Sequence, residues 1–100
     1  MKRCMQIQSG DDVATLLEPG KKEYVFDIID FSQKTVGQVK LIEDIPYPQK
    51  VAVKPVKKGQ MIIKYSEPIG KATADIPKGA MAHVHNIATI EGARGLKKTN

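Results

Sequence analysis

His83 and His85 are the only two histidines of the chain, and they lie two positions apart in the short apolar run of residues 80–86. Side chains alternate between the two faces of a β-strand, so a strand here would point both imidazoles the same way, roughly 6 to 7 Å apart. Such a pair offers two nitrogen ligands to a metal, or two groups that titrate near neutral pH to a polar substrate. A half-exposed, structural pair of histidines fits the same pattern.

A metal centre would need more ligands than this pair supplies. The chain contains no third histidine, and its single cysteine, Cys4, is distant in sequence. Carboxylates or a second chain would have to complete the coordination shell. We therefore expect His83 and His85 to contact a substrate, or to ligate a metal shared with a partner chain.

The segments that must position these histidines are short and separated by turn residues. Strands are predicted for residues 5–8, 23–31, 36–42, 50–53, 61–65 and 80–86, because these stretches are rich in β-branched and aromatic side chains. Residues 9–12 predict a turn whose last residues cap a short helix over residues 12–17. The sequence thus predicts a mostly β single domain of short strands with one short helix.

Length and charge limit what the chain does by itself. One hundred residues make one domain, too small to supply both walls of a deep cleft. Residues 1–50 hold seven Lys and Arg against eight Asp and Glu, whereas residues 51–100 hold nine against three. This basic half could attract nucleic acid, an acidic partner or a small anionic substrate, and charge alone does not choose between them. Nucleic acid is not expected, because no recognition helix or aromatic stacking platform is evident.

Cysteine usage and hydropathy indicate the compartment. A lone cysteine excludes an internal disulfide and fits a reducing environment. No stretch has the length and apolar character of a signal peptide or a membrane span. We expect a cytoplasmic protein that does not contact a membrane.

The order of motifs in the second half resembles a known family. The motifs are Asp44-Ile45-Pro46, Lys50-Val51-Ala52-Val53, Lys57-Lys58-Gly59, the run from Ile63 to Gly70, and His83-Val84-His85-Asn86. Together they resemble the small SAF-type module, a β-clip fold, of the altronate and galactarate dehydratases. The same module is similar to the small subunit of sulfolactate sulfo-lyase. The resemblance covers nearly the whole chain, with residues 1–95 as the SAF-like domain and residues 96–100 as a flexible basic tail.

The resemblance implies an activity and a partner. Members of the family remove water, or sulfite in the sulfo-lyase, from hydroxy-carboxylates, commonly with divalent iron. It implies that this chain is the small subunit of a hydro-lyase acting on a sugar acid such as altronate or galactarate. The active site would then be completed by a large dehydratase subunit, which would share the iron and carry most of the chemistry. The chain alone would be inactive.

The resemblance also places further residues at the site. We assign Gln49 and Asn86, beside Lys64 and Lys71, to substrate binding, and His83 and His85 to catalysis and to the shared metal. The family usually has histidine at the positions of Gln49 and Met81 in this chain, which leaves the particular hydroxy acid open. The alternative is a non-catalytic SAF-type module that binds carbohydrate or protein, since fold alone does not fix function.

Overall fold

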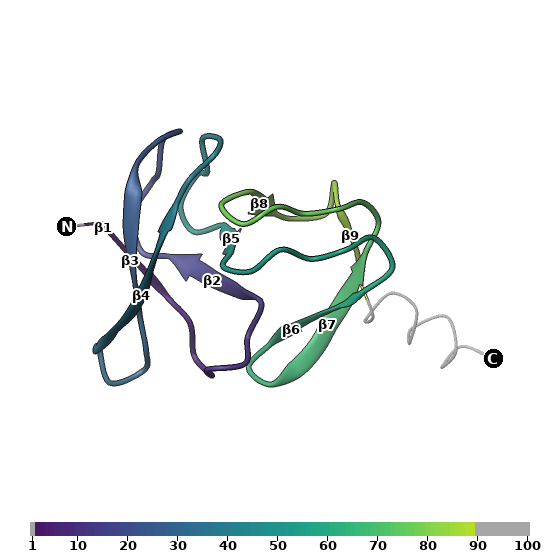
Figure 1. Cartoon of the computed structure of the whole chain (residues 1–100), viewed down its shortest axis with the longest axis horizontal. Coiled ribbons are helices and arrows are strands. Elements are labelled where there is room, and N and C mark those ends of the chain that lie inside the picture. Colours follow the sequence, from purple (N-terminus) through teal and green to yellow (C-terminus); the bar gives the residue numbers. More distant parts are fainter. Residues whose placement is uncertain (1, 90–100) are drawn as a thin grey trace.

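The computed structural model describes residues 2–89, which form nine β-strands and no helix (Figure 1). The strands are β1 (Lys2–Met5), β2 (Val13–Leu16), β3 (Val25–Ile29), β4 (Thr35–Lys40), β5 (Lys50–Ala52), β6 (Met61–Lys64), β7 (Glu67–Ala72), β8 (Met81–Ala82) and β9 (Ile87–Thr89). The mostly β single domain predicted from the sequence is confirmed. None of the described residues forms a helix with the length and apolar character needed to cross a bilayer.

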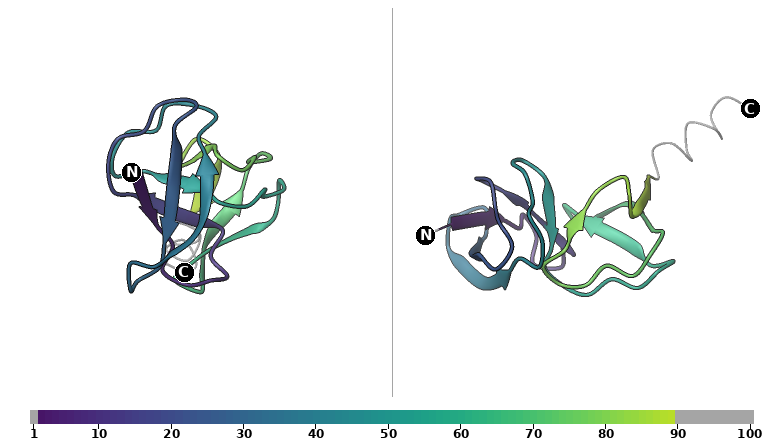
Figure 2. Two further views of the ribbon diagram at one scale, coloured as in Figure 1. Left: turned by 60° about the vertical axis from the view of Figure 1, so that its left-hand side comes forward. Right: turned by 90° about the horizontal axis from the view of Figure 1, so that it is seen from above.

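The strands build two sheets. The larger has the order β4-β3-β1-β2-β5-β8, and the smaller has the order β6-β7-β9. All pairs are antiparallel except β1 with β3. Seen from above, β1, β3 and β4 lie at one end of the molecule, and β6, β7 and β9 lie at the other (Figure 2).

Strands β2 and β5 form the shared wall between two apolar cores. Leu16 on β2 and Val51 on β5 pack into the core beneath β1, β3 and β4. Their neighbours Val13 and Ala52 face the opposite way, into the core beneath β6, β7 and β9. A strand buried on both faces reads as an uninterrupted apolar run, because neither face needs polar residues.

This double burial explains why the helix predicted over residues 12–17 is wrong. The run from Val13 to Leu16 shows no period-2 alternation, so its periodicity did not distinguish a two-sided strand from a helical turn. In the fold it pairs with β1 on one side and β5 on the other. Backbone pairing within the sheet therefore overrides the local capping signal of the preceding residues.

Other sequence predictions hold with shifted boundaries. The hairpin joining residues 23–31 to 36–42 is confirmed as β3 and β4, with a bulge at Ile28 and Ile29. The strand expected at residues 5–8 lies instead at Lys2–Met5, and β7 was missed because Pro68 interrupts its pattern. The basic tail predicted for residues 96–100 lies outside the described residues.

Candidate functional site

A pocket of about 330 Å³ lies between the two sheets. Strand β5 of the larger sheet lines one side, and β6, β7 and β9 of the smaller sheet line the other. The turn after β8 contributes His83 and Val84 to the lining. The lining residues are Lys50, Lys64, Tyr65, Ile69, His83, Val84 and Ile87.

Two lysines give this pocket its charge. Lys50 is half-buried at the start of β5, and Lys64 is half-buried at the end of β6. Burial, together with the nearby charge of Lys64, lowers the pKa of Lys50 from its ordinary value of 10.5. The ammonium group of Lys64 also lies 4.5 Å from the ring centre of Tyr65, a cation–π contact. Two like charges facing one pocket favour an anion between them.

The turn that carries the histidines differs from the sequence prediction. Strand β8 ends at Ala82, and residues 83–86 form a turn into β9, so the single strand predicted over residues 80–86 is wrong. His83 lines the pocket and is half-buried, whereas His85 is exposed and is not among the lining residues. The two imidazoles therefore do not share one strand face.

Asn86 is the physical reason for the turn. Its backbone N–H donates to the carbonyl of His83, and the N–H of His83 donates to its side-chain oxygen, both at 2.9 Å. Its side-chain Nδ2 donates to the carbonyl of Met81 at 2.8 Å. With both ends of its amide engaged in backbone contacts, Asn86 fixes the turn and so positions His83.

Of the two remaining predicted residues, Gln49 lies next to a pocket residue in the chain and Lys71 lies away from the pocket. Gln49 precedes β5, and the last pair of the β5–β8 ladder is Lys50 with Ala82. Gln49 and His83 thus leave that ladder at the same end, each next to a member of its last pair. Lys71 is exposed on β7, paired with Met61 and Ala88 in the sheets, and is not among the residues lining the pocket.

The described residues do not by themselves make a metal site. Within residues 2–89, no group of three or more His, Cys, Asp or Glu side chains is placed to hold an ion. The imidazole of His83 shares its pocket with two lysines, whose charges disfavour a divalent cation there. The donor set suits an anion better than a metal.

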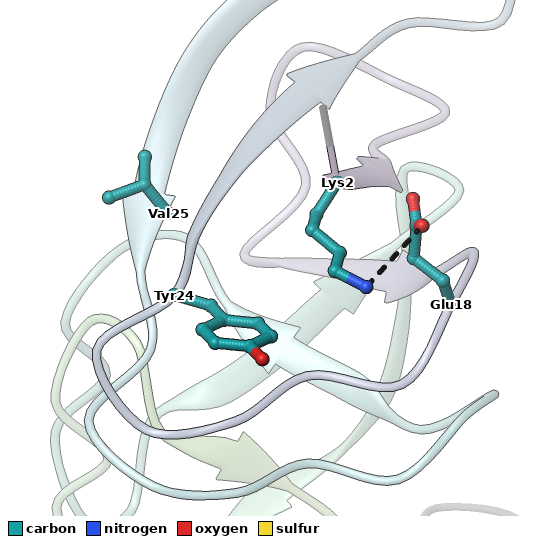
Figure 3. Close-up of a pocket in the computed structure, with 4 residues that line it drawn as sticks. All are labelled: Lys2, Glu18, Tyr24 and Val25. Atoms are coloured by element: carbon teal, nitrogen blue, oxygen red, sulfur yellow. Dashed lines mark ion pairs between the residues drawn. The ribbon is translucent and has the colours of Figure 1, made fainter.

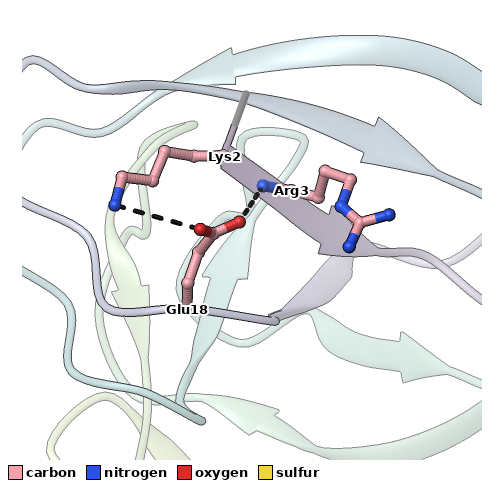
Figure 4. Close-up of polar contacts among 3 residues, drawn as sticks. All are labelled: Lys2, Arg3 and Glu18. Atoms are coloured by element: carbon pink, nitrogen blue, oxygen red, sulfur yellow. Dashed lines mark hydrogen bonds and ion pairs between the residues drawn. The ribbon is translucent and has the colours of Figure 1, made fainter.

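A larger cavity of about 500 Å³ lies elsewhere, lined by Lys2, Glu18, Tyr24 and Val25 (Figure 3). Its charged groups, Lys2 and Glu18, are already paired with one another. Lys2 Nζ lies 3.9 Å from Glu18 and 5.5 Å from the ring centre of Tyr24. The backbone N–H of Arg3 donates to the same carboxylate at 2.9 Å, while the Arg3 guanidinium points away from it (Figure 4). This cavity offers less chemistry than the smaller pocket.

Sequence reasoning missed Lys50 and Tyr65 as site residues. Lys50 belongs to one of the motifs noted above, and it is a charged residue directly before the buried pair Val51 and Ala52. A charge at the edge of a buried strand is a signal that could have identified it. Tyr65 carries no comparable signal, because its place depends on the turn between β6 and β7.

Comparison with known proteins identifies the family of the chain. The family model described as the altronate/galactarate dehydratase SAF domain matches residues 2–90. The alpha subunit of (2R)-sulfolactate sulfo-lyase from Paracoccus pantotrophus is 48% identical over 46 residues, which are 46% of this chain and 69% of that subunit. Altronate dehydratase from Bacillus subtilis is 29% identical over 92 residues, 89% of this chain but 17% of that enzyme.

A second altronate dehydratase, from Escherichia coli, is 43% identical over 51 residues, 51% of this chain and 10% of that enzyme. The chain therefore corresponds to a small part of these dehydratases and to most of the sulfo-lyase subunit. Because the family model covers every described residue, the chain belongs to the SAF-domain family of the altronate and galactarate dehydratases.

Proposed function

We propose that this chain is the small subunit of a hydro-lyase that removes water from a sugar acid such as altronate or galactarate. The observation that carries the proposal is the pocket that Lys50, Lys64 and His83 line together. The lysines would bind the substrate carboxylate. The imidazole, which can accept or donate a proton near neutral pH, would serve proton transfer.

Elimination of water from a hydroxy acid needs both carboxylate binding and proton transfer. A base removes the proton next to the carboxylate, hydroxide leaves the adjacent carbon with a proton from an acid, and the enol product becomes a ketone. Positive charges at the carboxylate stabilise the negative charge that develops during the first step. This chain supplies the positive charges and one group able to move a proton.

A separate large subunit would complete the site. Val84, at the pocket wall, is 70% exposed although it is apolar, and it would be covered in an assembly. The name of the sulfo-lyase relative, a subunit alpha, supports an enzyme of more than one subunit. The divalent iron implied by the resemblance would be held by the large subunit, because the charges of Lys50 and Lys64 disfavour a cation beside His83.

The small subunit of a sulfolactate sulfo-lyase is a second candidate, favoured by the 48% identity to that subunit. Its substrate is also an anionic hydroxy acid, and its leaving group is sulfite instead of water. We further propose that the assembly works in the cytoplasm, where the free thiol of Cys4 would stay reduced.

Co-expression with a large dehydratase-like chain from the same genome tests the proposal. The two chains are expected to co-purify and to convert altronate, galactarate or sulfolactate, whereas this chain alone converts none of them. The substrate that reacts, and whether sulfite is released, separates the two candidates. Failure to find a large partner, or an assembly that turns over none of the three acids, would favour a non-catalytic binding module.

A further inference from the structure

Asp11 is a fully buried carboxylate that is satisfied by backbone groups. Its side-chain oxygens accept hydrogen bonds from the N–H groups of Tyr65 and Ser66 at 2.9 Å and of Gln8 at 3.1 Å. The ion pairs found among the described residues, Lys2 with Glu18 and Lys40 with Glu23, do not involve it. A buried carboxyl group held only by backbone donors fixes those donors, because losing them would leave a buried polar group without partners.

The donors that Asp11 holds form a strained turn. Tyr65 and Ser66 connect β6 to β7, and their φ angles are 56° and 61°. Tight hairpin turns with two positive φ angles normally use Asn and Gly, because other residues meet steric resistance there. Contacts from outside the hairpin thus keep the backbone of Tyr65 and Ser66 in an unfavourable conformation.

The neighbouring residue fastens the strand before the turn. Asp12 accepts from the N–H of Ile63 through its side chain at 2.9 Å and donates its own N–H to the Ile63 carbonyl at 2.8 Å. Lys64 therefore lies between two anchored residues, Ile63 and Tyr65. Glu67, at the start of β7, is exposed.

The same segment also leads to the opposite wall of the pocket. Asp11 and Asp12 precede β2, and β2 pairs with β5 so that Thr15 lies opposite Lys50. One short segment thus connects the wall that carries Lys50 with the wall that carries Lys64. The separation of the two lysines depends on the contacts of Asp11 and Asp12 with the hairpin.

We propose that Asp11 is the positioning residue of an anion site in which Lys50 and Lys64 together bind one carboxylate group of a hydroxy acid. The proposal rests on the function proposed above in that this hydroxy acid is the substrate. Asp11 itself does not touch the ligand. It holds the turn whose residues place Lys64 and the ring of Tyr65 at the pocket.

The test is a titration of the full chain with galactarate, in which NMR records the chemical shifts of the backbone amides. Galactitol, the uncharged polyol with the same carbon skeleton, is the ligand control. Galactarate is expected to shift the amides of Lys50, Tyr65 and Ser66, and galactitol is not. If galactarate does not shift these amide resonances, the proposal is wrong, and the behaviour of the variants described below does not change that.

Substitution then isolates Asp11. Asp11→Asn is expected to weaken galactarate binding by at least about tenfold, since small displacements of binding groups have large effects. Asp30 provides a matched control, because its carboxylate accepts from the N–H groups of Ser32 and Lys34 in the distant β3–β4 turn. Asp30→Asn should leave the affinity within about twofold. Equal losses in both variants, or no loss in Asp11→Asn, would contradict a positioning role.

Glycine rescue separates positioning from general destabilisation. Ser66→Gly removes the steric resistance of the turn, so the double variant D11N/S66G should recover most of the affinity that D11N loses. A folded double variant that still fails to bind overturns the role assigned to the turn. If galactarate binding depends on Asp11 but the two-subunit assembly converts no hydroxy acid, only the proposed function is wrong.

Discussion

Lys50 and Lys64 reach one pocket from two different sheets, and the charge of Lys64 contributes to the lowered pKa of Lys50. In the free chain this arrangement is unfavourable, because two partly desolvated ammonium groups repel one another. An anion placed between them reverses the sign of the interaction. A bound anion would therefore offset a repulsion that the unbound pocket carries.

Lys50→Met should stabilise the free chain by up to about 1 kcal/mol while abolishing carboxylate binding. Methionine keeps the apolar stem and removes the charge that burial and Lys64 disfavour. Urea denaturation measures the stability. Lys71→Met, at an exposed position on β7, is the control and should change stability by less than about 0.5 kcal/mol. Destabilisation by Lys50→Met alone would contradict the charge argument.

The stability of the chain should also depend on pH through Lys50. Well below its lowered pKa, Lys50 is charged in both the folded and the unfolded chain, so the full penalty is present. As the pH rises through that pKa toward 10.5, the folded chain releases its proton first. The unfolded chain then binds more protons, and the free energy of unfolding gains a favourable contribution from this group. The difference between the stabilities of Lys50→Met and the natural chain should shrink over this range.

His83→Ala and His85→Ala should have unequal effects in the two-subunit assembly. His83 lines the pocket, so its loss is expected to reduce turnover by about two to four orders of magnitude, the usual size of a proton-transfer contribution. His85 is exposed and not among the lining residues, and its loss should reduce turnover far less. Steady-state rates with altronate and galactarate provide the measurement. Equal losses would place both imidazoles at the reacting centre.

Asn86→Ala should destabilise the fold by about 1 to 3 kcal/mol, because it leaves the part-buried Met81 carbonyl and His83 N–H without their side-chain partner. Urea denaturation gives the value. His85→Ala, in the same turn but exposed, is the control and should stay within about 0.5 kcal/mol. A stability of Asn86→Ala equal to that of the natural chain would show that the turn forms without its side-chain amide.

The thiol of Cys4 should resist modification in the folded chain. Burial, and secondarily the charge of Asp27, raise the pKa of Cys4 to about 12, so almost no thiolate exists at pH 8. Labelling with a disulfide reagent should be complete within minutes in strong urea and very slow without it. Fast labelling of the native chain would mean that β1 leaves the sheet readily.

Local patterns were sufficient where a segment has one buried face or a clear turn. The hairpin of β3 and β4 and the strands β5 and β6 follow from their β-branched residues and from the polar links between them. Val13–Leu16 was not identifiable, because its strand character depends on two cores that other segments create. Pro68 similarly conceals β7, which tolerates it beside the bulge at Ile62 and Ile63.

The candidate site was only partly predictable for a similar reason. His83 and Lys64 were assigned from their residue types and motifs, and both line the pocket. Lys50 gains its place from pairing with β2 and β8, and Tyr65 gains its place from Asp11, 54 residues earlier in the chain. Sequence separation of this size leaves no local pattern, so only the folded chain relates these residues to one another.

The strand order determines when the site can form during synthesis. Strand β5 is hydrogen-bonded between β2 and β8, so the larger sheet stays incomplete until Met81 and Ala82 have been made. Until then the core beneath β6, β7 and β9 lacks Ala82 and Ile87, so Val13 on that face of β2 stays incompletely covered in the ribosome-bound chain. His83 is the next residue to be added. Competence to bind a ligand in this pocket would therefore appear only after nearly all of the described chain has been translated.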